Sequence, residues 1–385
     1  MPRSSINLVA LVSAILLLTS GRSHAIIAGV DAAEGEFPWI AGIVQKGAFA
    51  GPALIGGGAL LRNQWVITAA HSVEPLTAAS IEVWMGSNDL EDPTGRVVRN
   101  VLAIFIHPDF ATNAGTSEND IALLLLDEPV SGIPLLPVLD DPLLLLTGDV
   151  VSVAGWGTST PGLAVPTTAL QKAPAEIISN EDAAVVFGTV ITDVHLAAVD
   201  PAETATPCVG DSGSPLVKNI GGTDTLVGLV SFGSADCEDA SLPSIYSRVP
   251  LYVSWIDERL DLTASPPGFT LNGRGRKVSS NAKPKERNGT DFGNLARPGR
   301  QRSRTFTLEN GGAGLLTVRS AILAGRGFRL RRSPATLIGS GAATSLRVTF
   351  RAPHGGKRFR SRLQFLSNDP ARPAYVLKLQ AKVRR

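Results

Sequence analysis

The sequence contains few cysteines, few aromatic residues and no long apolar segment. Its 385 residues include only two cysteines, Cys208 and Cys237, and 5% aromatic residues. The histidines that follow the N-terminal segment are His71, His107, His195 and His354. They show none of the regular ligand spacing of a metal site, so neither a metal nor a cofactor is expected. The longest apolar run, 6–18, has 13 residues, whereas a transmembrane helix needs about 20, so no transmembrane segment is predicted.

The first 25 residues have the pattern of an export signal. Arg3 precedes the apolar run, and Ser23 and Ala25 are small residues at the two positions that signal peptidase reads. A membrane anchor is the alternative, but the run is too short for one. We therefore predict a signal peptide over 1–25 and a secreted or periplasmic protein. In such a compartment Cys208 and Cys237 can form a structural disulfide.

Composition indicates a mostly β protein with two domains. The 39 Gly and 26 Pro residues fit turn-rich β structure better than helices, and 385 residues exceed one ordinary core. Charge divides the chain sharply: 26–262 holds 8 Lys and Arg against 30 Asp and Glu, a net charge of −22. The remainder, 263–385, holds 26 against 4, a net charge of +22. This change predicts a domain boundary near residue 262.

The apolar pattern predicts many short strands separated by Gly, Pro and Asp turns. In the acidic region they are expected at 58–61, 65–68, 81–85, 97–106, 121–126, 150–154, 216–218 and 226–231. An amphipathic helix is expected over 249–260. Residues 263–287 are rich in Gly, Pro and basic residues and are predicted to be a flexible linker. Six or seven short strands in 288–385 predict an antiparallel sandwich.

Three segments contain the residues that acyl transfer requires. His71 ends an apolar strand, Asp120 begins another, and Ser212 lies between glycines in Gly-Asp-Ser-Gly. A serine hydroxyl becomes a good nucleophile when an imidazole takes its proton, and a buried carboxylate fixes the imidazole tautomer. We therefore predict that these three residues are catalytic. The backbone N–H groups of Gly210 and Ser212 are expected to face the developing oxyanion.

These segments resemble the trypsin/chymotrypsin family of serine proteases. The chain order His, Asp, Ser is that of the family, and the similarity extends over 26–262. It includes Phe37-Pro38-Trp39, Gly155-Trp156-Gly157, Ser231-Phe232-Gly233 and the terminal helix. The resemblance implies an all-β fold of two six-stranded antiparallel barrels with a C-terminal helix and the site between the barrels. It also implies a serine endopeptidase that acts on proteins or peptides.

The sequence departs from the family pattern at two places. Ser72 replaces the cysteine that usually follows the catalytic histidine, and its usual partner position is Gly56, so both halves of that bridge are absent. Ser214 stands where the family usually has a second glycine after the nucleophile. The remaining pair, Cys208 and Cys237, resembles the bridge that ties the nucleophile loop to the wall of the substrate pocket.

The resemblance also implies an activation step. The segment that starts at Ile26 resembles the family's newly cut N-terminus, whose ammonium pairs with the carboxylate before the nucleophile, here Asp211. We hypothesise that signal cleavage after Ala25 creates Ile26 directly. A short propeptide beginning at Arg22 or Ser23 is the alternative.

By the same resemblance, four residues line the substrate pocket: Thr206, Ser231, Gly233 and Ser244. Thr206 at the base is neutral and offers no counter-charge to Lys or Arg, which favours small or medium apolar side chains at P1. In a rival interpretation an acidic rim around Cys237 recruits basic side chains. That rim consists of Asp236, Glu238 and Asp239.

Residues 288–385 resemble immunoglobulin-like modules of the abnormal-spindle/Hydin type. The resemblance rests on segments such as Asp291-Phe292-Gly293 and Ser367-Asn368-Asp369-Pro370, and it implies an accessory role. The charge of +22 suits an acidic polymer, or intramolecular docking on the acidic protease region. Few aromatic residues accompany the basic ones, so nucleic acid is not the expected partner.

Two classes of function remain open on the sequence. The first is an active peptidase with a tethering module. The second is a secreted binding protein on a protease scaffold whose catalysis has lapsed. No member of the triad is replaced, which favours the first.

Overall fold

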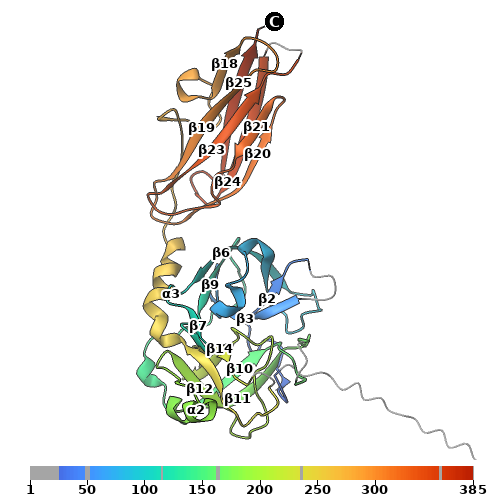
Figure 1. Cartoon of the computed structure of the whole chain (residues 1–385), viewed down its shortest axis with the longest axis vertical. Helices are drawn as coiled ribbons and strands as arrows, with labels where there is room; N and C mark the ends of the chain where they lie inside the picture. Colours follow the sequence, from blue (N-terminus) through green and yellow to red (C-terminus); the bar gives the residue numbers. More distant parts are fainter. Residues whose placement is uncertain are drawn as a thin grey trace, which may run out of the picture.

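A computed structural model describes residues 26–47, 53–113, 116–161, 165–234, 237–354 and 358–384. The expected signal peptide, 1–25, lies outside these residues. The described chain forms two β-barrels and a β-sandwich, which follow one another along the long axis of the molecule (Figure 1). No helix in this part of the chain has both the length and the apolarity to cross a membrane.

The first barrel is a closed ring of six antiparallel strands. In ring order they are β2 (Ile40–Gln45), β3 (Ala53–Arg62), β4 (Trp65–Thr68), β9 (Ala122–Leu126), β6 (Val97–Ile106) and β5 (Ile81–Met85). Every residue of β9 is buried because the strand serves two cores. Leu124 and Leu126 belong to the core of this barrel, whereas Leu123 and Leu125 belong to a second core that includes Ile256 of the C-terminal helix. This explains the uninterrupted apolar run.

The second barrel also closes through six strands. In ring order they are β11 (Gln171–Ile178), β10 (Val150–Gly155), β13 (Pro215–Ile220), β14 (Thr223–Phe232), β15 (Ser244–Arg248) and β12 (His195–Val199). Pairing of β12 with β11 closes the ring, and the short β1 (Val30–Asp31) adds to β11 from outside. The expected double six-stranded barrel is therefore confirmed.

The helices and the remaining hairpin of the barrel region are short. Helix α1 (Ala70–Val73) follows β4, and α2 (Asn180–Phe187) precedes β12. Strands β7 (Ala111–Asn113) and β8 (Thr116–Glu118) pair only with each other. The expected terminal helix is α3 (Val253–Leu260), whose apolar face is buried through Ile256 and Leu260.

The C-terminal part is a sandwich of two five-stranded sheets. One sheet contains β17 (Arg276–Lys277), β16 (Phe269–Gly273), β19 (Gln301–Asn310), β23 (Ala343–Arg351) and β21 (Phe328–Arg332). The other contains β18 (Asp291–Leu295), β25 (Ala374–Val383), β24 (Arg358–Ser367), β20 (Leu316–Ala324) and β22 (Leu337–Ile338). Alternate residues of β24 and β25 are buried between the sheets, as the alternating pattern predicts.

The sandwich begins earlier than the sequence suggested. Residues 269–277, expected to belong to a flexible linker, form β16 and β17, and β16 pairs along its whole length with β19. Phe269 and Leu271 are fully buried in the sandwich core. The strand was missed because its two apolar residues stand among Gly, Pro and Arg residues that indicate a loop.

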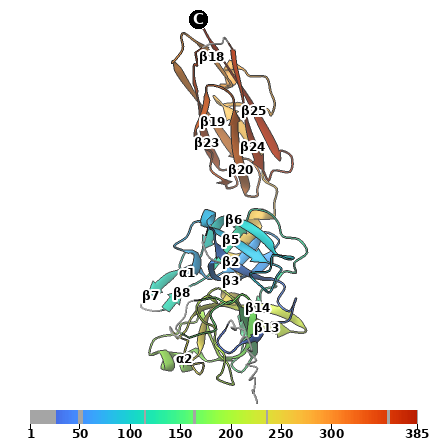
Figure 2. The same ribbon diagram turned by 90° about the vertical axis from the view of Figure 1, so that its right-hand side faces the viewer.

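The sandwich meets the barrels beside the end of α3. Leu315 N donates a hydrogen bond to Leu262 O at 2.7 Å, and the Leu315 side chain shares the core of the α3 residue Ile256. The views in Figures 1 and 2 agree that the sandwich lies next to the first barrel and that the second barrel lies at the opposite end.

Candidate active site

His71 and Asp120 meet because the strands that carry them are neighbours. His71 follows β4, Asp120 precedes β9, and the antiparallel register places Thr68 opposite Ala122. His71 Nδ1 lies 2.7 Å from Asp120 Oδ2, and the His71 backbone N–H donates to Asp120 Oδ1 at 2.8 Å. Both carboxylate oxygens are thus bound to one residue, which fixes the orientation of the ring.

The Asp120 carboxylate is fully buried and receives further support from the second barrel. Ser231 Oγ of β14 donates to Asp120 Oδ2 at 2.5 Å, and Ser247 Oγ of β15 donates to the backbone oxygen of Asp120 at 2.7 Å. The side chain of Ser231, a residue expected to line the substrate pocket, thus points to this carboxylate. Ser247 was not expected at the site, since a single serine in a strand gives no signal of a partner so distant in sequence.

Ser212 lies in a turn that packs against the strand before His71. Its backbone oxygen accepts a hydrogen bond from Gly57 N at 2.8 Å. A Cβ on Gly213 would lie 2.2 Å from Thr68 Oγ1, so glycine is required for this close approach. The structure therefore brings the Ser212 turn to the end of β4, where His71 begins its helical turn.

In this structure Ser72 contacts the outer nitrogen of the imidazole. Ser72 Oγ lies 3.4 Å from His71 Nε2, and among the described residues no hydrogen bond joins Ser212 Oγ to that nitrogen. Such bonds are often long before substrate binds. Ser72 also lies beside Gly56, where an added Cβ would be 3.4 Å from Ser72 Oγ, so the two positions that lack the usual bridge are adjacent.

Two backbone N–H groups flank Asp211 without an internal acceptor. Asp211 N donates to Cys208 O at 2.9 Å and Gly213 N to Val230 O at 2.8 Å. The N–H groups of Gly210 and Ser212, in contrast, have no acceptor within the part of the chain that the structure describes. Unsatisfied N–H groups of this kind can bind an oxyanion.

Asp211 is fully buried, and its carboxylate accepts hydrogen bonds from Gly157 N at 2.8 Å and Cys208 N at 3.0 Å. A Cβ on Gly155 or Gly157 would lie within 2.4 Å of the carboxylate, so both glycines are required there. Burial raises the pKa of Asp211 to about 6, against the lowering effect of the two backbone donors. Ile26 is also fully buried.

Three of the four expected pocket residues lie together. Thr206 Oγ1 is 3.3 Å from Ser244 Oγ, and a Cβ on Gly233 would lie 3.7 Å from that same Ser244 oxygen. Two hydroxyl groups therefore lie together at the position expected for the pocket base. Of the rival acidic rim, Glu238 and Asp239 are exposed, and Asp236 lies outside the described residues.

The two cysteines form the expected disulfide. Cys208 and Cys237 are bonded, with their Cα atoms 5.7 Å apart. The bridge joins the loop that contains Ser212 to the segment that follows β14. Among the described residues, no group of three or more His, Cys, Asp or Glu side chains is arranged to hold a metal ion.

The other two histidines of the barrel region lie against neighbouring elements. His195 is fully buried in β12, where its Nε2 lies 2.9 Å from Ser117 O. His107 lies with its ring centroid 5.2 Å from the rings of both Tyr252 and Trp255, and burial lowers its pKa. The apolar sequence after His195 could have indicated its burial.

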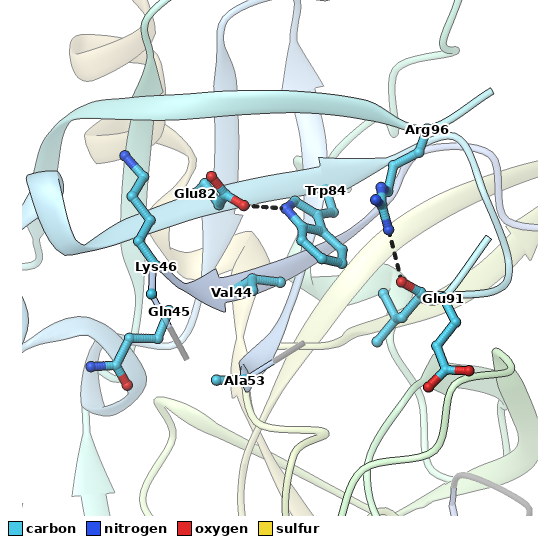
Figure 3. A pocket seen from close by; sticks show the side chains of 10 residues that line it. Val44, Gln45, Lys46, Ala53, Glu82, Trp84, Glu91 and Arg96 are labelled. Atoms are coloured by element: carbon cyan, nitrogen blue, oxygen red, sulfur yellow. Dashed lines mark hydrogen bonds between the residues drawn. The ribbon is translucent and has the colours of Figure 1, made fainter. Parts of the chain in front are cut away.

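A separate hollow lies on the first barrel, and its lining does not include His71, Asp120 or Ser212 (Figure 3). Its volume is about 430 Å³. The guanidinium of Arg96 lies 4.0 Å from the ring centroid of Trp84, and Trp84 Nε1 donates to Glu82 Oε1 at 2.7 Å.

Comparisons with known proteins agree with this geometry. The family model described as "Trypsin" matches residues 26–256. Human kallikrein-14 is 32% identical over 266 residues, which cover 67% of this chain and 94% of the kallikrein. The Drosophila melanogaster serine proteinase stubble is 30% identical over 61% of this chain, and the match spans only 31% of stubble.

Solved structures show the same fold. Mouse neuropsin, a serine protease, aligns over 61% of this chain with a TM-score of 0.54 and 26% identity. The Vibrio cholerae VesB protease aligns over 94% of this chain with a TM-score of 0.55 and 22% identity, so its likeness in fold extends into the sandwich. The matches cover the barrels in full, and the chain therefore belongs to the trypsin family of serine endopeptidases.

Proposed function

We propose that the protein is a secreted endopeptidase that cleaves peptide bonds through an acyl-enzyme formed on Ser212. The observation that carries the proposal is the pairing of His71 with the fully buried carboxylate of Asp120. Because Nδ1 of the imidazole faces the carboxylate, Nε2 is the nitrogen left to take the proton of Ser212 Oγ. The same nitrogen then gives that proton to the leaving amine, and water repeats the sequence to release the acyl group.

The N–H groups of Gly210 and Ser212 stabilise the oxyanion of each tetrahedral intermediate. Their lack of internal acceptors supports this role, because they are free to donate when negative charge develops. Ser212 Oγ needs to reach Nε2, which Ser72 contacts in the absence of substrate. We infer that substrate binding brings the hydroxyl and the imidazole together.

The alternative is a catalytically lapsed scaffold that acts as a secreted binding protein, favoured by the contact of His71 with Ser72. A fluorophosphonate probe distinguishes the two proposals. An active enzyme becomes labelled, and labelling disappears in Ser212→Ala. A chain that is folded, as judged by its thermal unfolding, but never labelled supports the lapsed scaffold.

Activation is proposed to follow from cleavage before Ile26. The new ammonium would pair with Asp211, and the burial of both residues supports this pairing, since an unpaired buried carboxylate is costly. N-terminal sequencing of the secreted protein tests the step. A start at Ile26 is expected, whereas a start at Arg22 or Ser23 means that a propeptide remains.

The substrate pocket is proposed to accept small or medium apolar P1 side chains. The hydroxyl groups of Thr206 and Ser244 at its base give no counter-charge for Lys or Arg. The exposed Glu238 and Asp239 keep the rival interpretation open, in which an acidic rim recruits basic residues. A panel of chromogenic peptides decides between them, and a strong preference for Arg at P1 would refute the apolar assignment.

The sandwich is proposed to be an immunoglobulin-like accessory module. Its charge suits either an acidic polymer or docking on the acidic barrels. Small-angle scattering at low and high salt tests docking, because an unchanged shape across salt concentrations argues against it.

A further inference from the structure

One face of the sandwich carries a dense array of cations. On β24, Arg358, Arg360 and Arg362 are exposed at alternate positions, while the residues between them are buried. On β25, Lys378 and Lys382 lie on the same face, and Lys382 is exposed. We refer to these five side chains as the β24–β25 face. Alternate residues along a strand are about 7 Å apart, so the charges form two regular rows.

The strand register sets these rows against each other. Arg358 lies directly opposite Lys382, and Arg362 lies directly opposite Lys378. Like charges in directly opposed positions destabilise a sheet. No ion pair with an acidic residue relieves any of the five within the described ranges. An external anion bound across the two strands would relieve this repulsion.

The face is also hollowed. A groove of about 760 Å³ runs over Arg360, Arg362 and Lys378 and is bordered by Lys283 and Pro284. Lys283 adds a sixth cation at its edge. The amide of Gln380 lies between Lys378 and Lys382 and lines the groove, and Gln364 follows Arg362 on the same face. Gln380 donates to Asp291 Oδ2 at 2.6 Å, which leaves its carbonyl oxygen for a further donor.

The opposite sheet is basic as well, but its inner cations have partners. Arg302 donates to Phe292 O, and Arg304 lies over the Phe292 ring with Glu286 and Asp291 close enough to affect its pKa. Charge alone is therefore a feature of the whole sandwich. What distinguishes the β24–β25 face is the combination of opposed cations and a groove.

We propose that the β24–β25 face binds a linear acidic polysaccharide whose sugars carry carboxylates. Guanidinium groups pair with carboxylates in bidentate fashion, and the amide of Gln380 among them suits a sugar hydroxyl. The large aromatic residues of the two strands, Phe359, Phe365 and Tyr375, are buried, so the face has no platform for stacking bases. Among the described residues of the two strands, Leu366 is the one large apolar side chain that is exposed, which disfavours insertion into a lipid surface.

The position of the face disfavours docking on the barrels of the same chain. Lys382 and its cross-strand partner Arg358 lie at the C-terminal end of β25. In Figure 1 this end of the sandwich lies away from the barrels. The inference specifies the accessory role proposed above and does not depend on peptidase activity. Loss of polysaccharide binding and loss of hydrolysis are separate results.

The test uses the full secreted chain with Ser212→Ala, which prevents self-digestion, and measures binding to polygalacturonate by calorimetry. The variant Arg358→Ser/Arg360→Ser/Arg362→Ser is compared with Arg329→Ser/Arg332→Ser/Arg347→Ser, which removes as many exposed charges from the opposite sheet. Neutral dextran, single-stranded DNA and vesicles of anionic phospholipid are tested in parallel. Unfolding temperatures verify that each variant is folded.

We expect polygalacturonate to bind with an affinity that falls as salt is added. The triple variant on β24 should lose at least about tenfold in affinity, whereas the triple variant on the opposite sheet should lose less than about threefold. We also expect the β24 variant to unfold at a higher temperature, because the opposed charges are removed. Equal losses in the two variants would overturn the proposal, as would the absence of binding. Tighter binding of DNA or vesicles than of polygalacturonate would assign the face to that other partner.

Discussion

Cleavage before Ile26 is expected to reverse the way in which pH affects stability. In the uncut chain Asp211 is fully buried, and its donors are the neutral N–H groups of Gly157 and Cys208. Burial therefore raises its pKa from 3.8 to about 6. If the ammonium created at Ile26 pairs with Asp211 as proposed, it should stabilise the ionised carboxylate and lower that pKa again.

The size of the effect follows from the two pKa values. A carboxyl with a higher pKa in the folded state than in the unfolded state holds its proton more tightly when folded. The uncut chain therefore loses stability as the pH rises from about 4 to about 6, and the loss is complete above that range. A difference of about two pKa units corresponds to about 3 kcal/mol of unfolding free energy.

The assay compares one preparation before and after cutting. The chain is produced with Ser212→Ala and a specific cleavage site directly before Ile26, and urea unfolding is measured between pH 4 and pH 7. Asp211→Asn, which does not titrate, is the reference for all other groups. The uncut chain should lose about 3 kcal/mol relative to that reference, and the cut chain should not. Equal pH dependence of the cut and uncut chains would refute the reasoning.

Three further predictions concern the site. Ser231→Ala removes the hydroxyl that donates to the buried Asp120 carboxylate, so kcat should fall about 10- to 100-fold with little change in KM. An unchanged kcat would show that this hydrogen bond does not support the proposed triad. Cys208→Ser/Cys237→Ser opens a loop closed across 29 residues and should lower the free energy of unfolding by about 3–4 kcal/mol; denaturation with equal midpoints would contradict this. Thr206→Asp places a charge beside Ser244 at the pocket base and should raise kcat/KM for Arg at P1 relative to Ala, with Thr206→Asn as the neutral control. An equal change in both Thr206 variants would mean that residue 206 does not select by charge.

Local motifs allowed much of the fold and site to be predicted from sequence. His71 and Asp120 each adjoin a short apolar strand, and two such strands that pair bring their ends together. The Gly-rich surroundings of Ser212 likewise indicated a tight turn with free N–H groups. The short apolar segments of 288–385 also indicated strands, and β24 is one of them.

The remaining features depend on partners that are distant in sequence. The side chain of Ser231 lies at Asp120 because β14 reaches the first barrel, and no local pattern specifies that contact. His195 is buried because β12 closes the second barrel between β11 and β15. Strand β16 is held by its pairing with β19, so its own short sequence, rich in loop-forming neighbours, gave little signal.

The central claim is that Ser212, His71 and Asp120 act as one catalytic unit, and a double-mutant cycle on kcat tests it most directly. If they do, Ser212→Ala and His71→Ala should each lower the rate by roughly a millionfold, and the double variant should be no slower than either one. Losses that multiply in the double variant, or a Ser212→Ala enzyme that retains most of its activity, would contradict the claim.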